Sequence, residues 1–247
     1  QTDWSWTPLV TDFDNDSYRD IIITNGFPKD VSDHDFITYR KDATGFTSKK
    51  ELLEQIPQIQ LNNFAFQNTG NLTFSAVTDK WVLPLSTFSS GAAYADFDND
   101  GALDMVINNI NDNALLYRNT SRESKDSANH FLQIKFKGSS QNISGLGATA
   151  TIYYNHNKMP FYENNPYRGY LSTMQCLGHF GLGKITVSES AVIRWNNNKK
   201  QTIKNVKADQ TLIVNILDAK ETYSYEQGAT DTNALFKEVT HESDINY

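Results

Sequence analysis

Apolar and polar residues alternate with a period of two along much of the chain, and this pattern predicts β-strands. In the first half the expected strands, including a hairpin around an Asn-Thr-Gly-Asn turn, lie at residues 4–10, 63–74, 89–94 and 114–119. Two β-branched or apolar runs, at residues 21–23 and 105–107, are expected to form further strands. The first half is therefore predicted to be rich in β-structure.

Residues 27–62 interrupt this rhythm with Pro28 and scattered charge. One helix is expected there, at residues 48–56, because Ser48 and Glu51 complete a Ser-x-x-Glu capping box. We interpret residues 27–62 as an insertion between strands.

The second half begins after residues 121–129, which are polar, lack a strand signal and are interpreted as a linker. Short strands separated by Gly- or Asn-rich turns are expected at residues 130–138, 148–154, 191–195, 201–203 and 210–216. Such a series predicts a β-sandwich over residues 130–218, followed by a tail at 219–247.

The chain contains the same acidic nine-residue loop twice, each time directly before an apolar strand. Carboxylates occupy positions 1, 3, 5 and 9: Asp12, Asp14, Asp16 and Asp20 in loop 1 (residues 12–20), and Asp96, Asp98, Asp100 and Asp104 in loop 2 (residues 96–104). Carboxylates this close repel one another unless a cation lies among them, and Ca²⁺ takes about six to eight hard oxygen ligands. The loops therefore predict two Ca²⁺ sites. A solvated acidic turn is the alternative for either loop taken alone.

Neither loop is an EF-hand, which needs a bidentate Glu at position 12 and flanking helices. Position 12 is Ile23 or Ile107, inside an apolar run that predicts a strand. By analogy with other calcium loops, the position-7 carbonyls of Tyr18 and Ala102 are expected to be further ligands.

Position 6 of each loop must turn sharply. Gly101 can do so without steric cost, whereas Ser17 loses roughly 1–2 kcal/mol in a left-handed conformation. We therefore expect loop 1 to form the weaker or more distorted site. The calcium is expected to be structural, with direct contact to a ligand as the alternative.

Composition limits the partners of the chain. Its 247 residues, 38% hydrophobic, are sufficient for a buried core, and a formal net charge of −7 argues against nucleic acid. Two Ca²⁺ ions would reduce that charge to −3, so much of the acidity is expected to be metal ligand. No stretch approaches the roughly 18 apolar residues of a membrane span.

The single cysteine, Cys176, provides neither an internal disulfide nor a zinc motif. Calcium loops of modest rigidity fill readily in the millimolar calcium outside cells and poorly in cytosol. We therefore expect an extracellular or cell-surface protein.

The acidic loops, together with residues 68–74 and 90–94, resemble FG-GAP/VCBS repeats, which form blades of β-propellers. Residues 130–216 are similar to the ASPIC/UnbV domain found beside such repeats in the cartilage acidic protein family and in large exported bacterial proteins. The matching segments are residues 142–148, 169–172, 179–183, 192–195 and 205–210. For function, this resemblance implies a metal role for the eight loop aspartates and supplies no catalytic residue.

The implied fold class is all-β, with partial β-propeller blades at residues 1–120 followed by the sandwich and a short helical insertion near 48–56. The loops begin 84 residues apart, and subtracting the insertion leaves a blade-sized repeat. Residues 235–247 resemble the opening of another repeat module. Because a closed propeller takes about four to eight blades, the remaining blades are expected in a larger polypeptide.

Other chemistry in the sequence is sparse. His179 could be a catalytic base, but no Gly-x-Ser-x-Gly motif accompanies it, so we interpret it as a structural histidine in a tight loop. Gly145-Leu-Gly147 and Gly181-Leu-Gly183 are interpreted as tight turns, because no helix follows them as a phosphate site requires. We expect no enzymatic activity.

Tyr167, Arg168 and Tyr170, in a Pro- and Asn-rich loop, are the candidate ligand-binding residues because aromatic faces stack on sugar rings. Packing between strands is the alternative for such aromatics. The favoured function is a calcium-stabilised, non-enzymatic adhesion or binding module with protein or glycan partners at the cell surface. The alternative is an accessory glycan-binding region of an exported polysaccharide-processing enzyme or uptake system.

Overall fold

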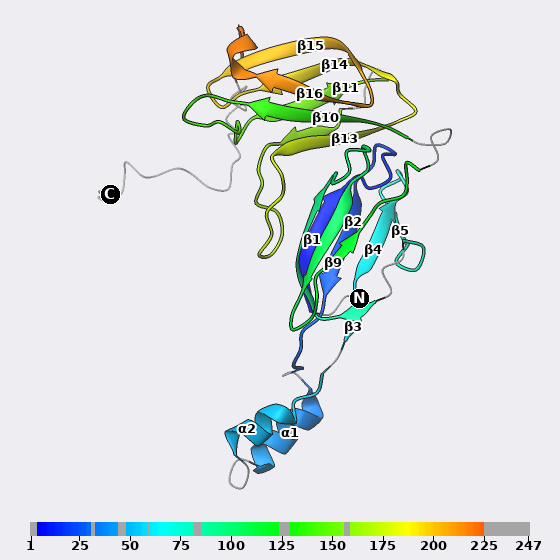
Figure 1. The fold of residues 1–247 in the computed structure, drawn as a ribbon, viewed down its shortest axis with the longest axis vertical. Coiled ribbons are helices and arrows are strands. Elements are labelled where there is room, and N and C mark those ends of the chain that lie inside the picture. Colours follow the sequence, from blue (N-terminus) through cyan, green and yellow to red (C-terminus); the bar gives the residue numbers. More distant parts are fainter. Residues whose placement is uncertain are drawn as a thin grey trace, which may run out of the picture.

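The computed structural model describes residues 4–30, 33–43, 48–58, 60–81, 85–123, 129–155 and 159–224. Figure 1 shows three parts along the long axis: a β-sandwich at one end, two sheets in the middle and a pair of helices at the other end. None of the sheets formed by the described residues closes on itself.

The middle part contains two antiparallel sheets with a shared plan. The first sheet has the order β1 (Ser5–Thr11), β2 (Asp20–Asn25), β4 (Phe64–Asn68) and β5 (Phe74–Ala76). The second sheet has the order β7 (Ser89–Ala95), β8 (Asp104–Asn109) and β9 (Leu115–Tyr117), and a small two-stranded sheet pairs β3 (Leu61–Asn62) with β6 (Ser86–Thr87). The predicted hairpin is confirmed by the pairing of β4 with β5.

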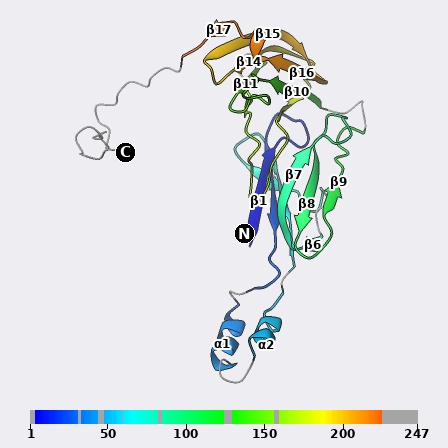
Figure 2. The ribbon, with the colours of Figure 1, turned by 60° about the vertical axis from the view of Figure 1, so that its left-hand side comes forward.

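One core joins the first and second sheets. It contains Leu9 from β1, Ile22 from β2, Ala65 from β4, and Met105 and Ile107 from β8. Along β1 buried residues alternate with more exposed ones, as expected for a strand with one face on a core. Figure 2 shows β1 beside β7, and β7 also contacts β2 of the first sheet.

The insertion forms two helices, α1 (His34–Ala43) and α2 (Lys49–Glu54). The Ser48 and Glu51 capping box is present at the start of α2, which confirms that helix. The prediction of a single helix was incomplete, because α1 has no apolar stripe: Phe36 is its only buried side chain among those described. Its start is fixed instead by the Phe36 N–H, which donates to the Asp33 carboxylate (2.7 Å).

The sandwich contains a three-stranded and a five-stranded sheet. The smaller sheet has the order β13 (Leu177–Gly183), β10 (His130–Lys137) and β16 (Gln210–Asn215); the larger has β12 (Phe161–Glu163), β11 (Thr149–Tyr153), β14 (Val187–Arg194), β15 (Lys199–Lys207) and β17 (Glu221–Thr222). A 3₁₀ helix, η1 (Ile216–Asp218), follows β16. All pairings are antiparallel except that of β10 with β16.

The core of the sandwich lies between its two sheets. Leu132 and Ile134 of β10 and Phe180 of β13 meet Ile152 of β11 and Ile193 of β14. The strands expected from alternation at residues 130–216 are present here. No helix of the described residues is both long and apolar enough to cross a bilayer.

The loop between β12 and β13, visible in Figure 1 beside β1, extends from the sandwich along the first and second sheets. The Thr7 hydroxyl of β1 donates to the Tyr170 carbonyl (2.9 Å), and the Ala92 N–H of β7 donates to Ser172 Oγ (3.0 Å). Met174 belongs to the core of the two sheets. The sandwich is therefore attached to both sheets by more than a chain connection.

Candidate metal centre

Loop 1 connects β1 to β2 and gathers three carboxylates. Oxygens of Asp12, Asp14 and Asp20 all lie within 4.8 Å of one another. Asp20 accepts hydrogen bonds from the N–H groups of Phe13 (3.0 Å) and Asn68 (2.9 Å). These bonds tie Asp20 to the loop and to the end of β4, so the carboxylate is fixed by backbone on both sides.

Loop 2 connects β7 to β8 and repeats this geometry. Oxygens of Asp96, Asp98 and Asp104 lie within 4.8 Å of one another. Asp104 accepts from the N–H groups of Phe97 (2.9 Å) and Asn119 (2.8 Å), the counterparts of Phe13 and Asn68. The repeated sequence therefore builds a repeated cluster.

The first carboxylate of each loop is also fixed by backbone donors. Asp12 accepts from the N–H groups of Asp16 (3.0 Å) and Ser17 (2.8 Å). Asp96 accepts from those of Asp100 (3.0 Å) and Gly101 (3.0 Å). Each loop thus folds around its own first aspartate.

Asp16 and Asp100 lie outside the three-carboxylate clusters. Each accepts from the N–H two residues later, that of Tyr18 (2.8 Å) or Ala102 (2.7 Å). Asp16 nevertheless lies close enough to Asp12 to raise the pKa of that carboxyl electrostatically. Their role as ligands, and that of the Tyr18 and Ala102 carbonyls, remains a prediction.

The prediction for position 6 is confirmed. Ser17 has φ 83° and Gly101 has φ 87°, so both adopt the left-handed conformation. Only Ser17 carries a Cβ, which costs roughly 1–2 kcal/mol in this region.

Burial makes the negative charge of loop 1 costly. Desolvation raises the pKa of Asp20 to about 7, although two backbone donors act against the shift. Desolvation, followed by repulsion from Asp14, raises the pKa of Asp12 well above its ordinary value. Clustered buried carboxylates of this kind need a positive charge to remain ionised at neutral pH. An all-oxygen set of donors with this need suits a hard divalent cation such as Ca²⁺.

Each cluster has a polar side chain on its middle aspartate, and the two differ. Gln67 donates to Asp14 Oδ2 (2.6 Å), whereas Arg118 donates to Asp98 Oδ2 (2.9 Å). Sequence reasoning missed both residues. The available signal was their position, because each stands directly before the Asn that donates to the last loop aspartate.

Both loops also contact the sandwich, which the sequence did not reveal. Interpreting Gly181-Leu-Gly183 as a tight turn was wrong for Gly181, which lies inside β13. It is confirmed for Gly183, which ends β13 with φ 57° and lies in a turn closed by the Ile185 N–H donating to the Leu182 carbonyl (3.1 Å). A Cβ at residue 181 would overlap Asp12 Oδ2 and come within 2.6 Å of Asn15 Cα, so only glycine fits there. The turn predicted at Gly145-Leu-Gly147 is present, with φ 63° and 79° at its glycines.

His179 lies in β13 rather than in a tight loop, and its ring nitrogens face the protein. Nε2 lies 2.7 Å from Asn15 Oδ1, while buried Nδ1 has no hydrogen-bond partner among the residues that the structure describes. Burial, with a smaller effect from Arg122, lowers the pKa of His179 to about 3. The ring is therefore neutral, and Nε2–H donates to Asn15. This arrangement is that of a structural histidine.

The side chains of the three candidate ligand-binding residues have different surroundings. Tyr167 is 75% exposed. Arg168 packs over the Tyr162 ring at 5.3 Å and donates to the Glu163 carbonyl (2.8 Å), so it faces the sandwich. The Tyr170 ring packs on Trp6 with centroids 4.8 Å apart. A single ligand site formed by all three remains a prediction.

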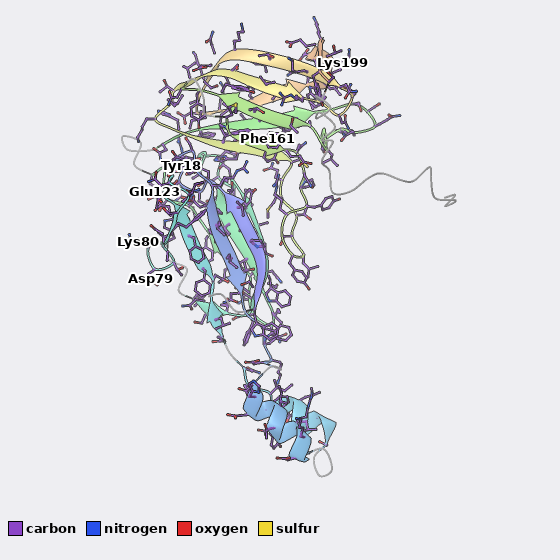
Figure 3. The ribbon with its side chains drawn as sticks, turned by 180° about the vertical axis from the view of Figure 1, so that it is seen from behind. Tyr18, Asp79, Lys80, Glu123, Phe161 and Lys199 are labelled. Atoms are coloured by element: carbon purple, nitrogen blue, oxygen red, sulfur yellow. The ribbon has the colours of Figure 1, made fainter. Side chains whose placement is uncertain are left out.

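The surface beside loop 1 contains a groove. This groove of about 560 Å³ runs between the first and second sheets, lined by Phe13, Ile22, Trp81, Met105 and Tyr117, with Asp14 at its side. Figure 3 places Tyr18 and Glu123 at the junction of these sheets with the sandwich. Loop 1 can therefore be reached from solvent through Asp14.

Comparison with known proteins bears on the sandwich. No curated protein matches the chain. Residues 138–221, which span the sandwich from the end of β10 to β17, match the family model described as ASPIC and UnbV.

Proposed function

We propose that this chain is a calcium-stabilised, non-enzymatic binding module of an exported or cell-surface protein. The observation that carries the proposal is the repetition of one cluster, three carboxylates with the same backbone donors, at the same place in two sheets. A solvated acidic turn has no need of such repetition. In this proposal the two sheets are partial FG-GAP/VCBS-type propeller blades, and further blades belong to a larger polypeptide.

The chemistry of the clusters favours calcium over other divalent ions. Every candidate ligand is a carboxylate or carbonyl oxygen, which soft-metal sites lack. Mg²⁺ demands a small octahedral shell and retains several waters, whereas Ca²⁺ accepts irregular shells built by loops. Extracellular calcium would keep such sites filled.

The test is calcium-dependent stability. Thermal unfolding is measured by calorimetry in EGTA and in millimolar calcium. Saturation at about 100 times Kd would add about 2.7 kcal/mol per site to the free energy of unfolding. Asp14→Ala and Asp98→Ala should each remove one site in a calcium titration, whereas Asp112→Ala, outside both loops, should not. An unfolding transition that is the same in EGTA and in calcium would contradict the proposal.

The alternative, an accessory glycan-binding region, is favoured by an aromatic series at the start of β1. Trp4 stacks on Phe27 (4.9 Å), Phe27 lies 6.0 Å from Trp6, and Trp6 contacts Tyr170 (4.8 Å). Aromatic faces bind the apolar faces of sugars through the same stacking.

A glycan array read for both binding and hydrolysis tests this alternative. Under it, Tyr170→Ala should lose glycan binding, and Tyr39→Ala, an exposed tyrosine of α1, should retain it. Binding with no turnover would favour the first function over an enzyme-associated one. Absence of binding to any glycan would leave protein partners as the proposed class.

A further inference from the structure

Contacts from the sandwich reach the clustered carboxylates themselves. Gln133 of β10 donates through Nε2 to Asp96 Oδ2 (2.8 Å), and its Oε1 accepts from Thr211 (2.8 Å). Gly181 of β13 lies so close to loop 1 that a Cβ at that position would overlap Asp12 Oδ2. In each cluster, one carboxylate is thus in contact with the sandwich: Asp96 through Gln133, and Asp12 through Gly181.

Backbone contacts continue this attachment. The Gly183 N–H donates to the Asn15 carbonyl (2.8 Å), and Asn129 Nδ2, directly before β10, donates to the Asp14 carbonyl (2.9 Å). Loop 1 is therefore held by the residue directly before β10 and by the last residue of β13.

Asn15 also connects the two loops. Its Nδ2 donates to the Gly101 carbonyl of loop 2 (2.9 Å), and its Oδ1 accepts from His179 of β13 (2.7 Å). Asn15 itself is 1% exposed. Because loop 1, loop 2 and β13 share this buried amide, movement of any one of them breaks a buried hydrogen bond, which costs about 1–3 kcal/mol.

We propose that strands β10 and β13 belong to the metal-binding unit, so that cation binding in the loops and docking of the sandwich onto the two sheets form one coupled equilibrium. The inference rests on the proposed function, because it requires the loops to bind calcium. Gln133 and Gly181 are positioning residues that act through Asp96 and Asp12.

The physical reason is a shared electrostatic cost. Docking places β13 against Asp12 and so removes water from a cluster of like charges. A cation among the carboxylates offsets that repulsion, and therefore it stabilises the docked state more than the undocked one. By linkage, docking must raise calcium affinity by the same factor by which calcium favours docking.

The first experiment measures calcium affinity of the 247-residue chain by titration calorimetry. Gly181→Ala should weaken binding at loop 1 by about 10–100-fold, the range found when partners that orient metal ligands are removed. The matched control is Gly178→Ala in the same strand, because its added methyl would meet Tyr162 of the sandwich (3.0 Å) and not a loop. The control should bind calcium like the wild type.

The second experiment follows docking itself by small-angle X-ray scattering. In calcium the wild type should have a smaller radius of gyration than in EGTA, because the sandwich leaves the sheets when the ion is removed. Gly181→Ala should keep the larger radius even in calcium. Gln133→Met, which removes one amide and changes little volume, should weaken calcium binding at loop 2. This variant tests the inference if Gly181→Ala fails to fold.

Failure of the two proposals can be told apart. If Asp14→Ala and Asp98→Ala bind calcium like the wild type, the proposed function is wrong. If those variants lose binding while Gly181→Ala and Gln133→Met bind normally, and the radius of gyration is the same in EGTA and in calcium, the coupling is wrong and the calcium sites stand.

Discussion

Loop 1 and loop 2 have the same backbone and different surroundings. The last aspartates, Asp20 and Asp104, are buried in both loops. In loop 1, Asp12 is 6% exposed, and a neutral amide, Gln67, contacts the middle aspartate. In loop 2, the side chain of Asp98 is 38% exposed and pairs with the cationic Arg118. The two loops thus share the geometry of their carboxylates but differ in the charge of the side chains around them.

This difference changes which loop is expected to form the weaker calcium site. Ser17 strain alone predicts a weaker loop 1, but the left-handed turn is held by the Ser17 N–H, which donates to Asp12 (2.8 Å), so its cost falls on folding more than on binding. Loop 2 already has a positive charge on Asp98, although solvent screening keeps the contribution of so exposed a pair small. Of the two middle aspartates, Asp14 therefore has the greater need of a cation.

The largest expected effect concerns position 6. Gly101→Ala should destabilise the chain by about 2–5 kcal/mol, the sum of left-handed strain and overpacking. The added Cβ would overlap the ring of Phe131 in β10, which is 7% exposed and cannot withdraw easily. Urea unfolding measures the change.

The matching substitution is at position 6 of loop 1, where Ser17 already has a side chain. Ser17→Ala keeps a Cβ at the equivalent position and should change stability by well under the cost of Gly101→Ala. Equal losses of unfolding free energy at the two positions would show that crowding by Phe131 is not what makes Gly101→Ala costly.

The next effect concerns calcium-dependent stability. Asp14→Ala should remove more of the stabilisation by calcium than Asp98→Ala, because Asp14 contacts the neutral amide of Gln67 whereas Asp98 already pairs with the cationic Arg118. The expected loss at loop 1 is about 2–3 kcal/mol at saturating calcium. The difference in melting temperature between EGTA and calcium measures it for each variant. If Asp98→Ala instead loses more of the stabilisation by calcium, loop 1 is the weaker site, as the strain at Ser17 alone predicts.

Much of this comparison could be predicted from sequence, because it depends on local pattern. Alternation located the strands around both loops, and the spacing of aspartates located Asp12 and Asp96. The requirement for Gly181 could not be predicted in the same way. Its cause is Asp12, a residue distant in the chain, and a glycine between Phe and Leu has no local sign that distinguishes a crowded strand from a turn.

A smaller effect is expected from relieving strain in loop 1. Ser17→Gly should raise the free energy of unfolding by about 1 kcal/mol, because glycine adopts φ 83° without a Cβ clash. Calcium affinity should change little, since the bond from the Ser17 N–H to Asp12 fixes the turn as part of the folded loop. Calorimetric unfolding and calcium titration of one sample separate the two quantities. A tenfold gain in affinity without a gain in stability would mean that the turn forms only on binding.

The smallest effect should come from Arg118. Arg118→Gln makes loop 2 resemble loop 1, where Gln67 occupies the equivalent place. Removing the guanidinium frees Asp98 for the ion and should raise calcium affinity at loop 2 by about two- to fivefold, as the weak energy of an exposed pair allows. Lys137→Gln at the far end of β10 is the control for net charge, because it removes the same charge without touching a loop. If both substitutions raise affinity equally, long-range attraction between the chain and the ion is responsible, and the contact of Arg118 with Asp98 has no separate effect.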